Sequence, residues 1–253
     1  ARDFVRRLSE RRKELDFLPT VSFGSAEISS ENVVTVKDRA DHNMYRYKKE
    51  RKAHRMSGDA GEEQSRGGQP MGQTEWSTLV ESICAERGLS VVLSWDMPQG
   101  YETANGTFDP VAKTLFLNPA VLQSAPEYEA MFYLVHELRH AEQYQHPERF
   151  DAMIRVSLPY VVLYDGTCFR LRGETWQECR LDGGEERFRD AYLGFPYEVD
   201  ANEFAAQRVK AFCGDSPALR QLRDCWRPKR IWSNEDYRRL LREIDERIEN
   251  SAR

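Results

Sequence analysis

Hydrophobic residues recur three or four positions apart in several stretches of the chain, which places them on one face of a helix. This spacing predicts helices over residues 76–87, 127–145 and 196–212, and a last helix that begins after Ser233. In the last helix five apolar residues share one face: Tyr237, Leu240, Leu241, Ile244 and Ile248.

Shorter runs of β-branched and aromatic residues predict strands. Residues 89–95, 101–108 and 114–118 form one group, with a turn at Asp109–Pro110 between the last two. A further strand is expected in the run SLPYVVLY, residues 157–164. The sequence therefore predicts an α+β fold with a small mixed or antiparallel sheet.

Local signals set the ends of the predicted helices. Ser124, followed three residues later by Glu127, matches a capping box, so we expect Ser124 to begin the helix that runs to residue 145. That helix stops before Pro147, because proline cannot continue a helix. Gly214 closes the helix over residues 196–212.

Polarity divides the chain into parts. Residues 1–36 read as a short helix followed by a strand. Residues 37–73 are rich in charge, Gly, Ser and Gln, and a segment of this composition cannot bury enough apolar area to order itself, so we interpret it as a flexible linker. Residues 74–253 form the main domain, with an insertion at about 149–195.

The linker is also where positive charge concentrates. Residues 37–55 hold eight Lys and Arg against three Asp and Glu, in a chain of net charge −5. Such a run is able to bind nucleic acid, but it is more often a solvated segment. Nucleic acid is therefore the less favoured partner, behind a protein or peptide substrate.

Two absences narrow the cellular setting. No apolar run is long enough to span a membrane, and the first residues lack the apolar core of a secretory signal. The five cysteines are widely spaced and include no CxxC pair, which argues against a disulfide scaffold. These features favour a cytoplasmic protein.

The chemistry is concentrated in residues 136–140, His-Glu-Leu-Arg-His. On a helix, His136 and His140 lie on the same face with Cβ atoms about 5–6 Å apart, so both imidazoles can bind one Zn²⁺. Glu137 lies about 100° around the helix from His136, where it can reach a metal-bound water as general base. The alternative is that both histidines are ordinary hydrogen-bonded helix residues.

A third ligand is sought among three acidic residues of the helix over residues 196–212. Glu198 heads an apolar stripe, whereas Asp200 and Glu203 fall off that stripe and are expected to face water. The stripe continues through Ala201, Ala205, Val209 and Phe212. A carboxylate on a buried face is costly unless it is paired or bound to metal, so Glu198 is the preferred ligand. The alternative is that Glu198 only favours the positive end of its helix.

His136-Glu137-Leu138-Arg139-His140, followed by Glu198-x-x-Ala201-Asn202-x-Phe204-Ala205, resembles the ImmA/IrrE family of zincin-like metallopeptidases. The resemblance covers about residues 90–212 and implies a zincin-like fold with C-terminal helices. It implies Zn²⁺ held by His136, His140 and Glu198, with Glu137 as the catalytic base. The chain departs from the family at Arg139, where glycine is usual, and in the long separation between His140 and Glu198.

Further roles follow from the zinc hypothesis. Asn202, one turn after Glu198, is a candidate for holding the ligand carboxylate in place. Tyr192, Tyr197 and His146 are candidates, by residue type only, for stabilising an oxyanion. The expected function is zinc-dependent peptide hydrolysis, of a regulatory or toxin type. The alternative is a binding module that keeps the zincin fold as a scaffold and contacts DNA or a protein through the basic linker.

Overall fold

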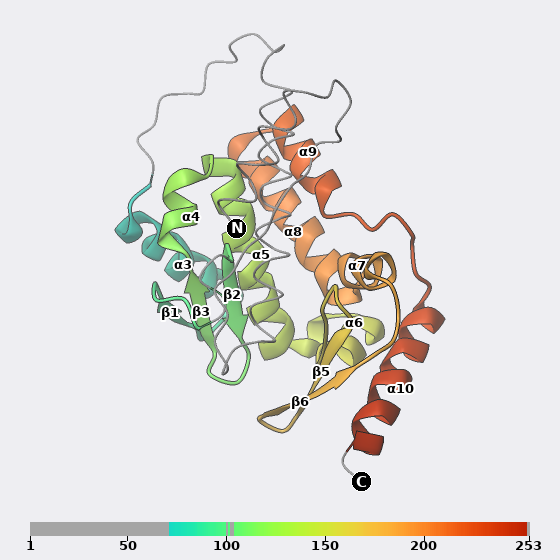
Figure 1. Cartoon of the computed structure of the whole chain (residues 1–253). Helices are drawn as coiled ribbons and strands as arrows, with labels where there is room; N and C mark the ends of the chain where they lie inside the picture. Colours follow the sequence, from blue (N-terminus) through green and yellow to red (C-terminus); the bar gives the residue numbers. More distant parts are fainter. Residues whose placement is uncertain (1–70, 100, 102–103, 252–253) are drawn as a thin grey trace, which may run out of the picture. The chain divides into compact units, whose positions relative to one another are not determined.

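The computed structural model describes residues 71–99, 101 and 104–251, which form eight α-helices, one 3₁₀ helix and two three-stranded sheets (Figure 1). The elements in chain order are α3 (Gln73–Arg87), β1 (Val92–Ser94), β2 (Gly106–Asp109), β3 (Thr114–Leu117), α4 (Pro119–Ser124), α5 (Glu127–Gln145), η1 (Pro147–Arg149), α6 (Ala152–Ser157), β4 (Tyr160–Val162), β5 (Thr167–Arg172), β6 (Thr175–Arg180), α7 (Glu185–Leu193), α8 (Pro196–Cys213), α9 (Pro217–Cys225) and α10 (Asn234–Ser251). The predicted helix and strand of residues 1–36, and nearly all of the linker 37–73, lie outside the described residues.

The first sheet has the strand order β1-β3-β2. β2 runs antiparallel to β3, with Thr107 opposite Phe116, whereas β1 runs parallel to β3, with Val92 opposite Thr114. The turn after Asp109 reverses the chain between β2 and β3 and so leaves β3 running in the direction of β1. The sheet is therefore mixed, and β2 forms one of its edges.

The second sheet occupies the predicted insertion and is antiparallel throughout, in the order β4-β5-β6. The run SLPYVVLY, predicted as one strand, forms a strand only at Tyr160–Val162, because its first residue still belongs to α6. Helix α10 packs on β5 and β6, and all five apolar residues of its predicted face are buried. The sequence pattern therefore identified the contact face of α10 but left β5, β6 and α7 unplaced.

The structure tests two of the residues that were expected to begin or end a helix, Ser124 and Gly214. The prediction that Ser124 begins the helix that carries His136 and His140 is wrong. Ser124 is the last residue of α4, and its hydroxyl donates a hydrogen bond to the Ala120 carbonyl. α5 instead begins at Glu127 after Pro126, since the proline holds the preceding residue in an extended conformation. The predicted end of the helix over residues 196–212 is confirmed, because α8 stops at Cys213 and is followed by Gly214 with a φ of 85°.

Buried side chains form two hydrophobic cores. The first lies among α3, the first sheet, α5, α9 and the later part of α8, and the second among α6, the second sheet, α7 and α10. α8 serves both: Tyr197 belongs to the second core and Val209 to the first. α5 and α8 lie side by side in Figure 1. The middle of this helix pair is therefore fixed by packing from two directions.

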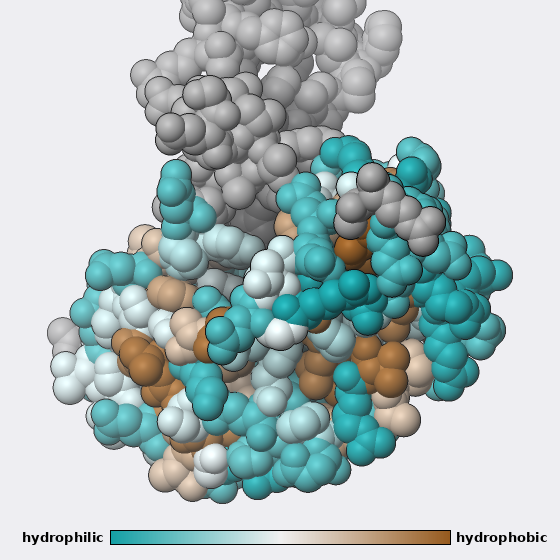
Figure 2. Space-filling model, turned by 90° about the horizontal axis from the view of Figure 1, so that it is seen from below, coloured by the Kyte–Doolittle hydropathy of each residue, from teal (hydrophilic) through white to brown (hydrophobic). Residues whose placement is uncertain are grey.

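The face seen in Figure 2 is mostly hydrophilic, and its apolar patches are interrupted by polar side chains. Among the described residues, no helix combines the length and apolar character needed to cross a bilayer. The apolar residues of the described segment are thus used mainly in the two cores.

Candidate metal centre

Helix α5 carries the first two candidate ligands on a buried surface. One face of α5 is an apolar stripe whose residues are at most 4% exposed: Met131, Leu134, Leu138 and Ala141. His136 and His140 project elsewhere on the same helix and are also buried, because α8 covers that side. α5 therefore has two buried faces, one apolar and one that carries the imidazoles.

The structure brings His136, His140 and Glu198 together across the α5–α8 contact. The Nε2 atoms of the two histidines are 2.9 Å apart, and Glu198 Oε2 lies 3.3 Å from His136 Nε2 and 3.7 Å from His140 Nε2. Each residue offers one ligand atom, and these atoms lie within 4.8 Å of one another. Glu198 is thus a partner of both rings and not merely a charge at the start of α8.

This donor set fits a small divalent cation. Zn²⁺ binds imidazole nitrogen and carboxylate oxygen at about 2.0–2.2 Å, so adjacent ligand atoms of a tetrahedral site are about 3.3 Å apart. The three separations in the triad, 2.9, 3.3 and 3.7 Å, are centred on that value. Three protein ligands leave a fourth position for water or substrate, as in catalytic zinc sites.

The charges of the triad complement one another. Burial raises the pKa of Glu198, but the nearby charge of His140 and hydrogen bonds from both rings lower it to about 2. Burial lowers the pKa of His140, but Glu198 and Glu137 raise it, to about 9. Without a cation, therefore, the buried carboxylate is balanced by a proton on the facing imidazole.

Glu137 lies beside this triad and is partly exposed to solvent. Desolvation of its carboxylate raises its pKa, while the two histidines and a hydrogen bond from the Phe108 backbone lower it to a smaller extent. Strand β2 approaches closely here, since a Cβ added to Gly106 would lie 3.4 Å from Glu137 Cγ and 3.0 Å from the Phe116 carbonyl oxygen. Glu137 therefore lies between the buried triad and the edge strand.

Asp200 differs from its prediction. It is only partly exposed, because Arg139 binds both of its carboxylate oxygens, at 2.7 and 3.0 Å, across 61 residues of sequence. Gln143 also binds Asp200 and, through its other amide atom, contacts His140. Glu203 is exposed as expected. The apolar stripe is correct at Ala201, Ala205 and Val209 but ends before Phe212, which is 66% exposed.

Asn202 is buried on α8, one turn after Glu198. Neither of its side-chain polar atoms has a hydrogen-bond partner among the described residues, so no bond to the Glu198 carboxylate is present. His136 Nδ1 is buried and without a partner in the same sense. The predicted role of Asn202 toward Glu198 thus stays a prediction.

Two of the three oxyanion candidates are occupied elsewhere. The Tyr197 hydroxyl donates to the Tyr160 carbonyl at 2.9 Å, and His146 Nε2 lies 3.0 Å from the Gly88 carbonyl. Tyr192 packs edge-on against Tyr164, and burial followed by the charge of Glu198 raises its pKa well above the usual value. Tyr192 keeps its hydroxyl protonated and is the remaining candidate.

Two aromatic rings flank His136. The ring centroids of Phe132 and Trp226 each lie 6.4 Å from the centroid of the His136 ring, at interplanar angles of 22° and 31° respectively. Phe132 is one helical turn before His136, so its position could have been inferred from spacing. Trp226 follows α9 and reaches the site only through the fold.

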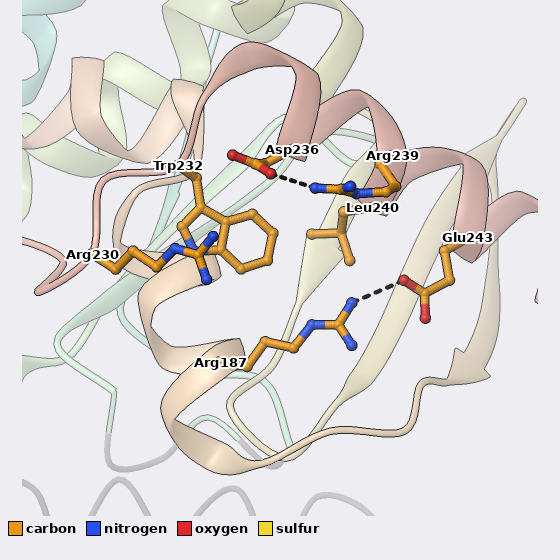
Figure 3. Close-up of a pocket in the computed structure, with 7 residues that line it drawn as sticks. All are labelled: Arg187, Arg230, Trp232, Asp236, Arg239, Leu240 and Glu243. Carbon is orange, nitrogen blue, oxygen red and sulfur yellow. Dashed lines mark hydrogen bonds and ion pairs between the residues drawn. The ribbon is translucent and has the colours of Figure 1, made fainter.

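Cavities also occur away from the triad. One, of about 240 Å³, is lined by α7, α10 and the segment before α10 (Figure 3). Its charges are largely matched, because Arg187 binds Glu243 at 2.9 Å, Arg239 binds Asp236, and Arg230 lies over the Trp232 ring. A second cavity lies between α3 and β1. Neither is lined by a triad residue.

Comparison with protein-family models, curated proteins and solved structures found no match to this chain. The candidate site therefore rests on the chemistry and geometry of its own residues.

Proposed function

We propose that this chain is a zinc-dependent peptidase of the zincin type, similar to the ImmA/IrrE family. In this proposal His136, His140 and Glu198 hold the metal and Glu137 is the general base. The observation that carries it is the convergence of two imidazole nitrogens and one carboxylate oxygen, with Glu137 adjacent.

In the proposed hydrolysis the metal and Glu137 have different roles. Bound at the triad, Zn²⁺ supplies Lewis acidity and lowers the pKa of a water molecule to about 7. Glu137 is suited to accept the proton of the attacking water and pass it to the leaving amine, since its raised pKa brings it closer to neutral pH. The Phe132 and Trp226 rings lie beside His136 and leave the Glu198 side of its ring for the metal.

Strand β2 supports a peptide as the substrate. The Asn118 N–H donates to the Asn105 carbonyl, and with the β2–β3 register this directs the backbone groups of Gly106 and Phe108 away from β3. The Phe108 N–H already donates to Glu137, so the Gly106 groups and the Phe108 carbonyl are left for a peptide. No described strand pairs with that outer edge. An extended peptide added to the edge would lie next to Glu137.

Metal analysis of the purified protein tests the proposal. We expect about one equivalent of zinc, lost in His136→Ala and retained in His146→Ala, because His146 contacts the Gly88 carbonyl and not the triad. Two imidazoles and a carboxylate also suit Fe(II), so bound iron in place of zinc would contradict it. Zinc below about half an equivalent, unchanged by His136→Ala, would do so as well.

A second variant tests the role of Glu137. Glu137→Gln keeps the size of the side chain but cannot accept a proton, so we expect it to retain zinc and to lose about 10²–10⁴-fold in the rate of peptide cleavage. Cleavage is measured on an unfolded protein substrate with mass spectrometry of the products. An unchanged rate would exclude Glu137 as the base.

A further inference from the structure

The Gln143 side chain is fully buried and all of its amide hydrogen-bonding groups are used. Its Nε2 donates to the Tyr197 carbonyl at 2.9 Å and to Asp200 Oδ2 at 2.8 Å, while its Oε1 lies 2.8 Å from His140 Nδ1. A carbonyl and a carboxylate can only accept, so the two amide hydrogens must point toward Tyr197 and Asp200.

This arrangement determines the state of the His140 ring. Because Oε1 can only accept, the proton it faces must be on His140 Nδ1. A neutral ring then has its lone pair on Nε2, the atom that faces His136 and Glu198. Which imidazole nitrogen binds a metal is set by the hydrogen bond that the other one makes.

Asp200 is itself held in place. Arg139 binds both of its oxygens, and the same guanidinium contacts Glu142 at 2.7 Å. The guanidinium also lies 4.6 Å from the Phe150 ring centre and 4.4 Å from that of Phe204. Bidentate pairing and stacking on two rings restrict its movement. Gln143 thus has no alternative orientation that keeps its hydrogen bonds.

We propose that Gln143, anchored by Asp200 and the Tyr197 carbonyl, is the positioning residue that presents His140 Nε2 to a divalent cation and so sets the affinity of the triad. This inference rests on the proposed zinc site. It also gives a role to the Arg139–Asp200 pair between α5 and α8. The pair fixes the Gln143 amide, which in turn fixes the His140 ring.

The test is a zinc titration of the metal-free full-length protein against a chromogenic chelator. Gln143→Met keeps the volume and removes the hydrogen bonds, and we expect zinc affinity to fall about 10–100-fold. Gln145→Met is the matched control, since Gln145 lies on the same helix and its amide also makes two bonds, both to the Ser90 backbone. It is expected to keep the wild-type affinity.

A second variant separates the acceptor of Gln143 from its donors. Gln143→Glu keeps an oxygen that accepts from His140 Nδ1, but it removes both donors and places a second carboxylate against Asp200 Oδ2 and the Tyr197 carbonyl, so zinc affinity should fall. Zinc affinity equal to that of wild type in Gln143→Glu would contradict the anchoring by Asp200 and the Tyr197 carbonyl.

The absorption spectrum of bound Co²⁺ reports on geometry in the same samples. Gln143→Met should alter the visible bands, and Gln145→Met should not. If wild type binds zinc but Gln143→Met binds it equally well with an unchanged Co²⁺ spectrum, the positioning role is wrong and the zinc site stands. Equal losses in Gln143→Met and Gln145→Met would also overturn it. If wild type binds neither metal, the proposed function and this inference both fail.

Discussion

At the scale of single residues, the two imidazoles of the triad differ in the surroundings of their second nitrogen. His140 Nδ1 is held by Gln143, whereas His136 Nδ1 is buried without a hydrogen-bond partner among the described residues. The Asn202 amide is unpaired in the same way. Leaving a buried polar atom unpaired costs about 1–3 kcal/mol. His140 is therefore the preoriented ring, and the unpaired polar atoms on the helices that carry the triad include those of His136 and Asn202.

The protonation of His140 makes metal binding depend on pH. Burial lowers and Glu198 raises the pKa of His140, to about 9, so at pH 7 the metal-free ring is protonated. Its Nε2 must lose that proton to bind a cation, while Glu198, with a pKa of about 2, is already ionised. We expect zinc binding to release about one proton from His140 at pH 7, and zinc affinity to rise with pH up to about 9.

Calorimetry in buffers of different ionisation enthalpy measures this release. A zinc affinity that does not change between pH 6 and pH 9 would contradict the prediction.

At the scale of elements, the site depends on the close approach of α5 and α8. Ala201 and Ala205 are fully buried and lie on the Glu198 face of α8. Ala201→Leu adds volume where there is no space, so we expect a loss of about 1–3 kcal/mol in the free energy of unfolding, and weaker zinc binding because Glu198 is displaced. Glu203→Leu, at an exposed position of the same helix, should change neither. Chemical denaturation with a zinc titration measures both quantities, and a normal zinc affinity in Ala201→Leu would contradict the prediction.

The sequence predicted the parts of the site whose causes are local. Helical spacing placed His136 and His140 together, and the apolar positions after Glu198 indicated which acidic residue is buried. Asp200 was misassigned because its partner, Arg139, is 61 residues away, and helical periodicity contains no information about a pairing at that range. Ser124 was misassigned because a short helix, α4, ends where a capping box was expected.

Elements of the fold were likewise predictable where their signals are local in the sequence. α10 was predictable because its apolar residues recur strictly on one face, and α5 and α8 were predictable because a stop signal, Pro147 or Gly214, follows each of them. The hairpin of β5 and β6 was not, since only residues 167–168 and 179 of its strands are buried, so alternation along them is weak. The expected division at residues 36 and 73 stays a prediction.

At the scale of the whole described segment, the metal would connect elements that belong to both cores. We expect removal of zinc by EDTA to lower the thermal midpoint of unfolding. At a zinc concentration of about 1,000 times Kd, binding stabilises by about 4 kcal/mol, or roughly 8–16 °C for a protein of this size. Differential scanning calorimetry measures the shift, and His136→Ala is expected to show none. An equal shift in both proteins would indicate binding elsewhere.

The position of Glu198 also has a consequence for when the candidate centre can form during synthesis of the chain. The ribosome completes His136 and His140 almost 60 residues before Glu198, and the intervening chain builds the whole second sheet. A nascent chain that ends within that sheet has two ligands and no third, so it cannot assemble the centre. The candidate centre can therefore form only after α8 has been synthesised, and it becomes one of the last features of the fold to be completed.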